Sequence, residues 1–93
     1  MGGGPTMDGD EFDLALAGGA DDRVRVAFVR EARRLAGERA RQGSSGVAER
    51  LRRLAGEVAA PGRPSPELVA GLDIELDEVR HRLTGAWRRN PPA

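Results

Sequence analysis

The sequence contains no cysteine and no lysine, and only three of its 93 residues are aromatic. Without cysteine the chain has no disulfides, so it does not look like a small secreted domain held together by covalent bridges. No apolar run approaches the ~20 residues of a membrane-spanning helix, and no signal peptide is visible. A cytoplasmic protein with no membrane contact is therefore the expectation.

Residue types that carry catalysis are also scarce. His81 is the single histidine, and serine occurs only in a turn and at a helix start, so a nucleophile has no base beside it. The glycines at 2–4 are not followed by a strand or a lysine, as a phosphate-binding loop requires. We expect neither an enzyme nor a cofactor.

Charge is abundant, and it is balanced. Fifteen cationic side chains, all of them arginine, face fifteen acidic ones, which gives a net charge of zero. A neutral chain does not fit a protein whose main task is to coat nucleic acid. The use of arginine alone, together with the many alanines and glycines, indicates a GC-rich bacterial genome.

The spacing of apolar residues predicts an all-α fold. Asp21 and Asp22 supply an N-cap and a favourable charge at the start of a helix whose apolar residues share one face. In front of it, Phe12 and Leu16 lie four residues apart in an acidic segment, which predicts a short helix. The fold class is therefore a small three-helix bundle with a short N-terminal helix.

Breaks in the pattern set the expected boundaries. Glycine and serine at 43–46 end one helix, and Ser65 with Pro66 provides a cap and a first-turn proline for the last one. We expect a disordered N-terminal arm at 1–7, a single helical domain at 8–89 and a tail at 90–93. The predicted helices cover about 10–17, 22–41, 47–59 and 66–88.

The last predicted helix has the sharpest pattern, because its apolar residues recur at alternating steps of three and four. Acidic residues come first along it and arginines follow, so it needs a partner helix of matching charge. That helix belongs either to this chain or to a second copy, paired in parallel or antiparallel; we expect a homodimer. The interaction seam comprises Val69, Leu72, Leu76, Val79, Leu83 and Trp87, and the charge-pairing residues are Asp73, Glu75, Arg80 and Arg82.

Glu78 and His81 have the Glu-x-x-His spacing that places two metal ligands on adjacent helical turns in di-iron bundles. Both residues fall on the side of the helix away from the seam, where they are expected to face solvent. No second carboxylate-rich helix supplies the remaining ligands. The sequence therefore predicts no metal site.

Arginines concentrate in the two middle helices and suggest a second class of function. The segment 47–54 resembles the recognition helix of a winged helix-turn-helix, although a Pro-Gly linker stands where the wing would be. The acidic start of the last helix would repel phosphate, so a solvated arginine face is the alternative. The candidate nucleic-acid face comprises Arg33, Arg34, Arg50 and Arg53.

Two segments, 14–35 and 65–76, resemble parts of the C-terminal docking domains of modular polyketide synthases. In that family two helices dimerise, and a last acidic helix engages the coiled coil of the next protein. An additional helix, 47–59, separates the matching parts here. The resemblance implies that Leu68, Leu72, Asp73 and Leu76 contact the partner, and that Phe28 and Leu35 form the dimer.

These observations favour one function and leave an alternative open. We expect a non-enzymatic protein–protein interaction module, for docking or dimerisation, that acts through amphipathic helices. The alternative is a small DNA-binding transcriptional regulator that uses the arginine face of the middle helices.

Overall fold

The computed structural model describes residues 9–60 and 63–84. All regular secondary structure in these ranges is α-helical, which confirms the all-α prediction for this part of the chain. The expected arm at 1–7, the end of the last helix beyond residue 84 and the tail at 90–93 lie outside the described residues. The helices are α1 (Gly9–Ala17), α2 (Asp22–Arg41), α3 (Ser45–Ala59), α4 (Pro66–Gly71) and α5 (Asp73–Thr84).

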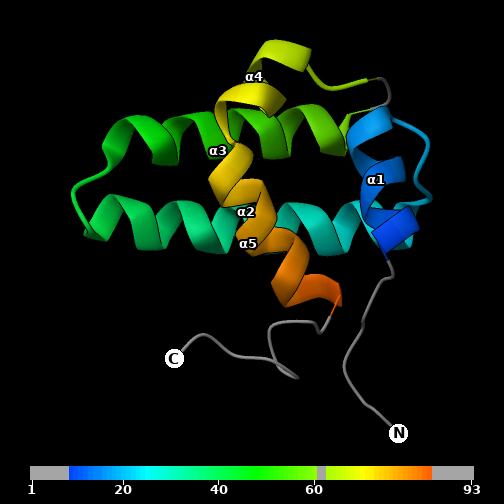
Figure 1. Ribbon diagram of the computed structural model, residues 1–93, viewed down its shortest axis with the longest axis horizontal. Helices are drawn as coiled ribbons and strands as arrows, with labels where there is room; N and C mark the ends of the chain where they lie inside the picture. The colour runs from blue at the N-terminus through cyan, green and yellow to red at the C-terminus, as the bar shows by residue number, and fades with distance from the viewer. Residues whose placement is uncertain (1–8, 61–62, 85–93) are drawn as a thin grey trace, which may run out of the picture.

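Helices α2 and α3 form an antiparallel hairpin (Figure 1). The Asp21 carboxylate accepts a hydrogen bond from the backbone N–H of Val24 at 3.0 Å, so the predicted N-cap of α2 is present. At the other end, Gly43 has a φ of 89°, in the left-handed region that favours glycine. The N–H of Ser44 reaches the carbonyl of Arg39 at 2.8 Å, which makes this turn a Schellman motif.

The last part of the chain differs from the single helix expected over 66–88. Ser65 and Pro66 begin α4 as predicted, with the Ser65 hydroxyl accepting from the N–H of Leu68 at 3.4 Å. Helix α4 then ends at Gly71, and Leu72 leaves the helical conformation with φ −115° and ψ 29°. Gly71 weakens the helix at this point, because glycine is a poor helix former. The break allows Leu72 to remain fully buried while α5 runs in a different direction from α4.

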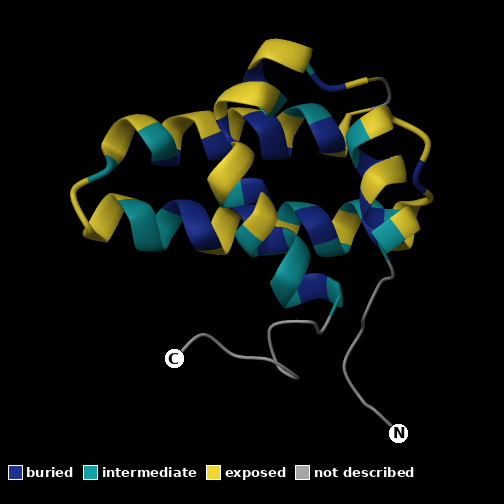
Figure 2. Ribbon diagram, in the orientation of Figure 1, coloured by how far each residue is buried: buried dark blue, intermediate teal, exposed yellow. Residues whose placement is uncertain are grey.

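Helix α5 crosses the α2–α3 hairpin instead of running alongside it, so the three longest helices do not lie parallel as in an up-and-down bundle (Figure 1). Helix α1 packs against α2 and touches α5. Buried residues from all five helices form a single core beneath this crossing (Figure 2). Its largest fully buried side chains are Phe28, Leu35, Leu51, Leu54, Leu72, Val58, Val79 and Pro64.

In the described ranges, no helix has the length and apolar character needed to cross a membrane.

Candidate functional site

The apolar seam of the last third packs inside the chain itself. Leu72, Leu76, Val79 and Leu83 are all buried, with at most 8% of their surface exposed, and Val69 packs against the edge of the same core. Trp87 lies outside the described residues. Of the two arrangements that the sequence left open, the structure has the internal one for the described part of the seam, Val69 to Leu83, which presents no free apolar face to a second copy.

A cluster of ion pairs fixes α5 on α2, with Arg82 at its centre. Both terminal nitrogens of Arg82 donate to the Glu38 carboxylate, at 2.9 and 3.2 Å, in a bidentate pair. Arg82 also donates to Glu31 at 2.9 Å and to Glu78 at 2.6 Å. One guanidinium therefore ties two positions of α2 to α5.

This arrangement shifts the titration of two of its members. The hydrogen bond to Glu38, with help from Glu31, raises the pKa of Arg82 above its ordinary value against the opposing effect of burial. Reciprocally, the hydrogen bond from Arg82 lowers the pKa of Glu38 below 4.5, although desolvation acts against it. Both groups are therefore held in their charged forms, which keeps the contact between the helices intact at neutral pH.

Glu78 belongs to the same cluster, so the expectation that it faces solvent was wrong. Its carboxylate accepts from Arg39 at 2.6 Å as well as from Arg82, and its side chain is only 19% exposed. The sequence pattern showed which residues lie off the seam, but α5 crosses α2 at an angle that turns this flank toward Arg39. Glu75 adds a longer contact of 3.9 Å to the same arginine.

His81 does not join Glu78 in a metal-binding arrangement. Its ring Nδ1 lies 2.7 Å from the backbone carbonyl of Asp77, one turn earlier in α5. Across residues 9–60 and 63–84, no group of three or more His, Cys, Asp or Glu side chains is placed to hold a metal ion.

A second polar contact fastens α1 to α5. Arg80 donates to Asp13 at 2.8 Å, and its guanidinium lies 5.5 Å from the ring centre of Phe12. Phe12 in turn packs against Phe28 at 5.4 Å. Of the residues expected to pair by charge, Glu75, Arg80 and Arg82 therefore pair within the chain, whereas Asp73 is exposed and has no ion pair with any described residue.

The arginines of the candidate nucleic-acid face remain on the surface. Arg33 and Arg34 of α2 are exposed, as are Arg50 and Arg53 of α3. None of the four has an ion-pair partner within the described part of the chain. Helix α2 carries seven arginines against three carboxylates and α3 three against two, so the hairpin has an excess of cations.

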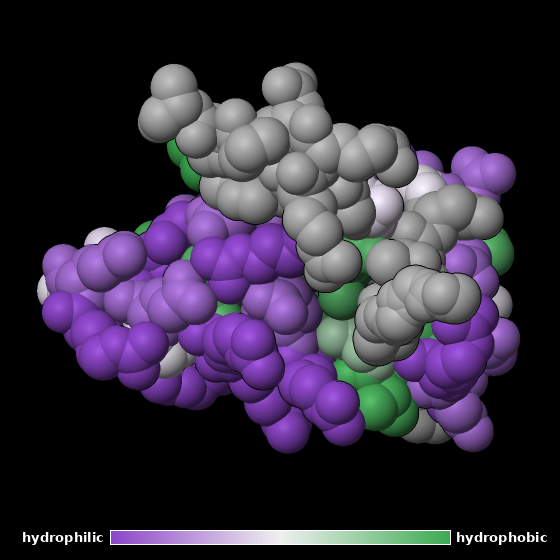
Figure 3. Space-filling view, turned by 90° about the horizontal axis from the view of Figure 1, so that it is seen from below, coloured by the Kyte–Doolittle hydropathy of each residue, from purple (hydrophilic) through white to green (hydrophobic). Residues whose placement is uncertain are grey.

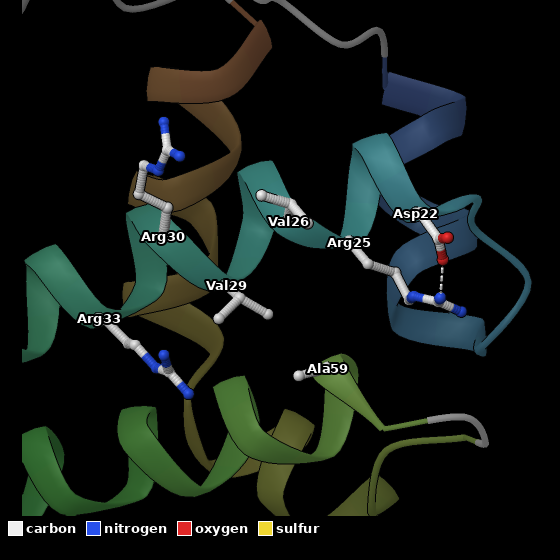
Figure 4. Close-up of a pocket in the computed structure, with 7 residues that line it drawn as sticks. All are labelled: Asp22, Arg25, Val26, Val29, Arg30, Arg33 and Ala59. Atoms are coloured by element: carbon white, nitrogen blue, oxygen red, sulfur yellow. Dashed lines mark hydrogen bonds and ion pairs between the residues drawn. The ribbon is translucent and has the colours of Figure 1, made fainter.

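The outer face of α2 contains a hollow of about 590 Å³ beside the C-terminal end of α3, and one of its lining residues, Val29, packs against the edge of the core. Val26 is 56% exposed at this hollow, and Val29 and Ala59 point toward each other across the gap between the two helices (Figure 4). Arg30 and Arg33 extend to opposite sides of α2 there, and Arg25 pairs with Asp22 at one end. We call this set the α2 hollow: Asp22, Arg25, Val26, Val29, Arg30, Arg33 and Ala59.

Seen from the side of α2, apolar atoms reach the surface in a patch bordered by hydrophilic residues (Figure 3). Such a patch is informative because large apolar side chains left in water are costly unless a partner covers them. In the described ranges, only Leu14, Val26 and Ile74 are exposed large hydrophobic residues.

Sequence reasoning did not identify the α2 hollow. It placed the apolar residues of the helix predicted over 22–41 on one face, which becomes the core, and it gave Val26 no role. The missed signal was a second stripe in which Val26, Val29 and Arg33 recur at steps of three and four, and which runs from the edge of the core at Val29 to the exposed Val26 and Arg33. The participation of Ala59 could not be foreseen, since it depends on where α3 ends against α2.

No protein-family model, no curated protein and no solved structure matches this chain. The residues to which the docking-domain resemblance assigns contacts are largely internal: Phe28 and Leu35 are fully buried, and Leu68 and Leu76 are nearly so. Those contacts could form only if this core opened.

Proposed function

We propose that this chain is a non-enzymatic protein-interaction module whose partner binds the outer face of α2. The observation that carries the proposal is Val26, a large apolar side chain more than half exposed at a hollow on a well-packed helix. The seam of α5, which sequence reasoning favoured for this role, serves instead to hold the module together. The class of function is the one expected from the sequence, a protein–protein interaction module, but the proposed binding surface is the outer face of α2 and not the seam of the last helix.

The chemistry of the α2 hollow suits a protein partner. Val26, Val29 and Ala59 gain from contact with another apolar group, because that contact removes their surface from water. Arg30 and Arg33 lie at the rim, where charge steers association and selects a partner of opposite sign more than it adds affinity. An apolar residue with acidic neighbours is therefore the complementary feature.

The remainder of the fold makes this surface rigid. Arg82 of α5 donates hydrogen bonds to Glu31 and Glu38 of α2. The same helix is also held in the core by the fully buried side chains of Phe28 and Leu35. A surface carried on such a fixed helix loses little conformational freedom when a partner binds.

Site-specific photo-crosslinking tests the proposal. A photoreactive side chain at position 26 of the full chain should give a defined protein adduct in an extract of the cells that express it. The control is the same group at Arg52, an exposed position of α3 that does not line the hollow. Adducts of equal yield at both positions, or none at position 26, would refute the assignment.

DNA binding is a second candidate, favoured by the exposed and unpaired state of Arg33, Arg34, Arg50 and Arg53 among the described residues. Duplex binding at low salt should then weaken in the Arg50→Ala, Arg53→Ala double variant, with a shallower dependence on salt because fewer counterions are released. Absence of any duplex binding at low salt removes this candidate.

A further inference from the structure

The chain has two exposed apolar features with opposite charge around them. At the α2 hollow, Val26 lies among arginines. On α5, Ile74 is 74% exposed, the largest exposure of any bulky apolar side chain among the described residues. Asp73 precedes Ile74, and Asp77 lies one helical turn beyond it, with its side chain 67% exposed.

Ile74 stands on the outer side of α5. Leu76, Val79 and Leu83 point into the core, and Ile74 falls almost opposite to them around the helix. Asp73 has no ion pair with any described residue. Ile74 therefore projects away from the hairpin, with the carboxylates of Asp73 and Asp77 beside it. We call Ile74 together with these two carboxylates the α5 knob.

The knob and the hollow face in opposite directions. Helix α5 lies across one face of the α2–α3 hairpin, and in the close-up of the hollow it passes behind α2 (Figures 1 and 4). One copy therefore cannot bring its own Ile74 to its own Val26. Two copies can, if the α5 side of one lies against the α2 side of the next.

We propose that the occupant of the α2 hollow is a second copy of this chain, bound head to tail. Ile74 of one copy inserts between α2 and the end of α3 of the next, where it contacts Val26 and Val29. Asp73 and Asp77, one turn apart on the same flank of Ile74, then face the rim of the hollow, where Arg30 and Arg33 are exposed. This inference rests on the proposed function, because it names the partner of the same surface.

The charge of whole elements supports this orientation. Helices α2 and α3 carry an excess of arginine, whereas Asp73 and Asp77, the two carboxylates at the start of α5 that do not pair with α2, are exposed near Ile74. Opposite potentials on the two surfaces favour encounter in this orientation, and they disfavour pairing of two hollows or of two knobs. The interface is therefore heterologous, and it extends from copy to copy until a ring closes or a filament grows.

Sedimentation equilibrium of the full chain provides the test. The weight-average mass should rise with protein concentration, and it should rise less at high salt because the acidic and basic rims are screened. Val26→Glu and Ile74→Glu, which place a negative charge in the hollow and on the acidic knob, should each weaken association about tenfold or more. Leu14→Glu, at an exposed apolar residue outside both surfaces, is the matched control and should leave association unchanged.

Mixing the two variants separates head-to-tail pairing from a symmetric dimer. Ile74→Glu retains an intact hollow and Val26→Glu an intact knob, so an equimolar mixture should form a 1:1 pair of parent affinity that grows no further. Circular dichroism checks that each variant keeps its helices. If Val26→Glu does not fold, the double variant Arg30→Glu, Arg33→Glu replaces it, since both arginines are exposed.

The possible outcomes are distinct. A monomer at all concentrations, an unchanged mass in either variant, or a mixture that forms no heterodimer overturns the self-association. If the chain is monomeric while position 26 still crosslinks to another protein, the proposed function stands and only the identity of the partner is wrong. If position 26 crosslinks to nothing, both proposals fail.

Discussion

The two faces of α2 show how the same residue types acquire different roles. On the inner face, Val24 and Phe28 are buried in the core, and Glu31 and Glu38 each bind Arg82 of α5. On the outer face, Val26 is largely exposed, and Arg30 and Arg33 beside it have no ion pair with any described residue. Valine, arginine and helical geometry are common to both faces, so the position of α5 makes the difference.

That position also separates stability from recognition. The inner face contributes burial and hydrogen bonds that involve partly desolvated charges, whereas on the outer face Val26 is more than half exposed and Arg33 has no ion pair with any described residue. Substitutions on the inner face should therefore change the free energy of unfolding, whereas substitutions on the outer face should change binding.

Phe28→Ala should have the largest effect, because it removes a fully buried aromatic ring that packs on Phe12. We expect a loss of about 3–5 kcal/mol in the free energy of unfolding, enough to unfold much of so small a domain. Val26→Ala on the outer face is the comparison and should change stability by less than about 0.5 kcal/mol. Urea denaturation followed by circular dichroism measures both, and equal losses would contradict the division between the faces.

Arg82→Met should have an intermediate effect. The substitution keeps the length of an unbranched side chain but leaves Glu31, Glu38 and Glu78 close together without their shared cation. Because these groups are only partly exposed, we expect a loss of about 1–3 kcal/mol. Arg33→Ala, at an exposed arginine with no partner among the described residues, should stay within about 0.5 kcal/mol. If Arg33→Ala lowers the free energy of unfolding as much as Arg82→Met does, the loss comes from removing any arginine of the domain and not from breaking the ion-pair cluster.

The smallest expected effect is a dependence on pH. The pKa of Glu38 is lower in the folded chain than its ordinary 4.5, so its contribution to stability is complete above about pH 4.5 and disappears as pH falls through the lowered value. Glu38→Gln should therefore flatten the fall of thermal stability in acid. Arg82→Met should flatten it as well, because the hydrogen bond that lowers the pKa is gone. An unchanged acid profile in both variants would mean that other carboxylates dominate.

Local signals in the sequence predicted a good part of the fold. The cap at Asp21, the end of α2 before Gly43 and the Ser65-Pro66 start depend on short-range hydrogen bonds and backbone geometry, and all three occur where expected. Helix α3 begins at Ser45, two residues earlier than predicted, so Ser45 and Gly46 belong to the helix and not to the turn. The break at Leu72 was missed. Its helical spacing fits a continuous seam, and the helix ends there because Gly71 weakens it and because Leu72 stays buried where α5 turns to cross the hairpin.

The candidate site was harder to predict for the same reason. Periodicity shows which side chains share a face of one helix, but it does not show what covers that face. Glu78 looked solvated until α5 turned it toward Arg39, and Val26 looked incidental until α3 ended beside it with Ala59.

The sequence by itself determined an all-α chain, the starts and ends of most of its helices, and the need of the last helix for a partner. These properties depend on spacing and on caps, which act over a few residues. Only the tertiary structure decided that this partner is the chain's own hairpin and that, among the described residues, none covers the apolar hollow on the outer face of α2. Both depend on the angle at which α5 crosses α2, which is set by contacts between residues about 40 to 50 positions apart in the sequence.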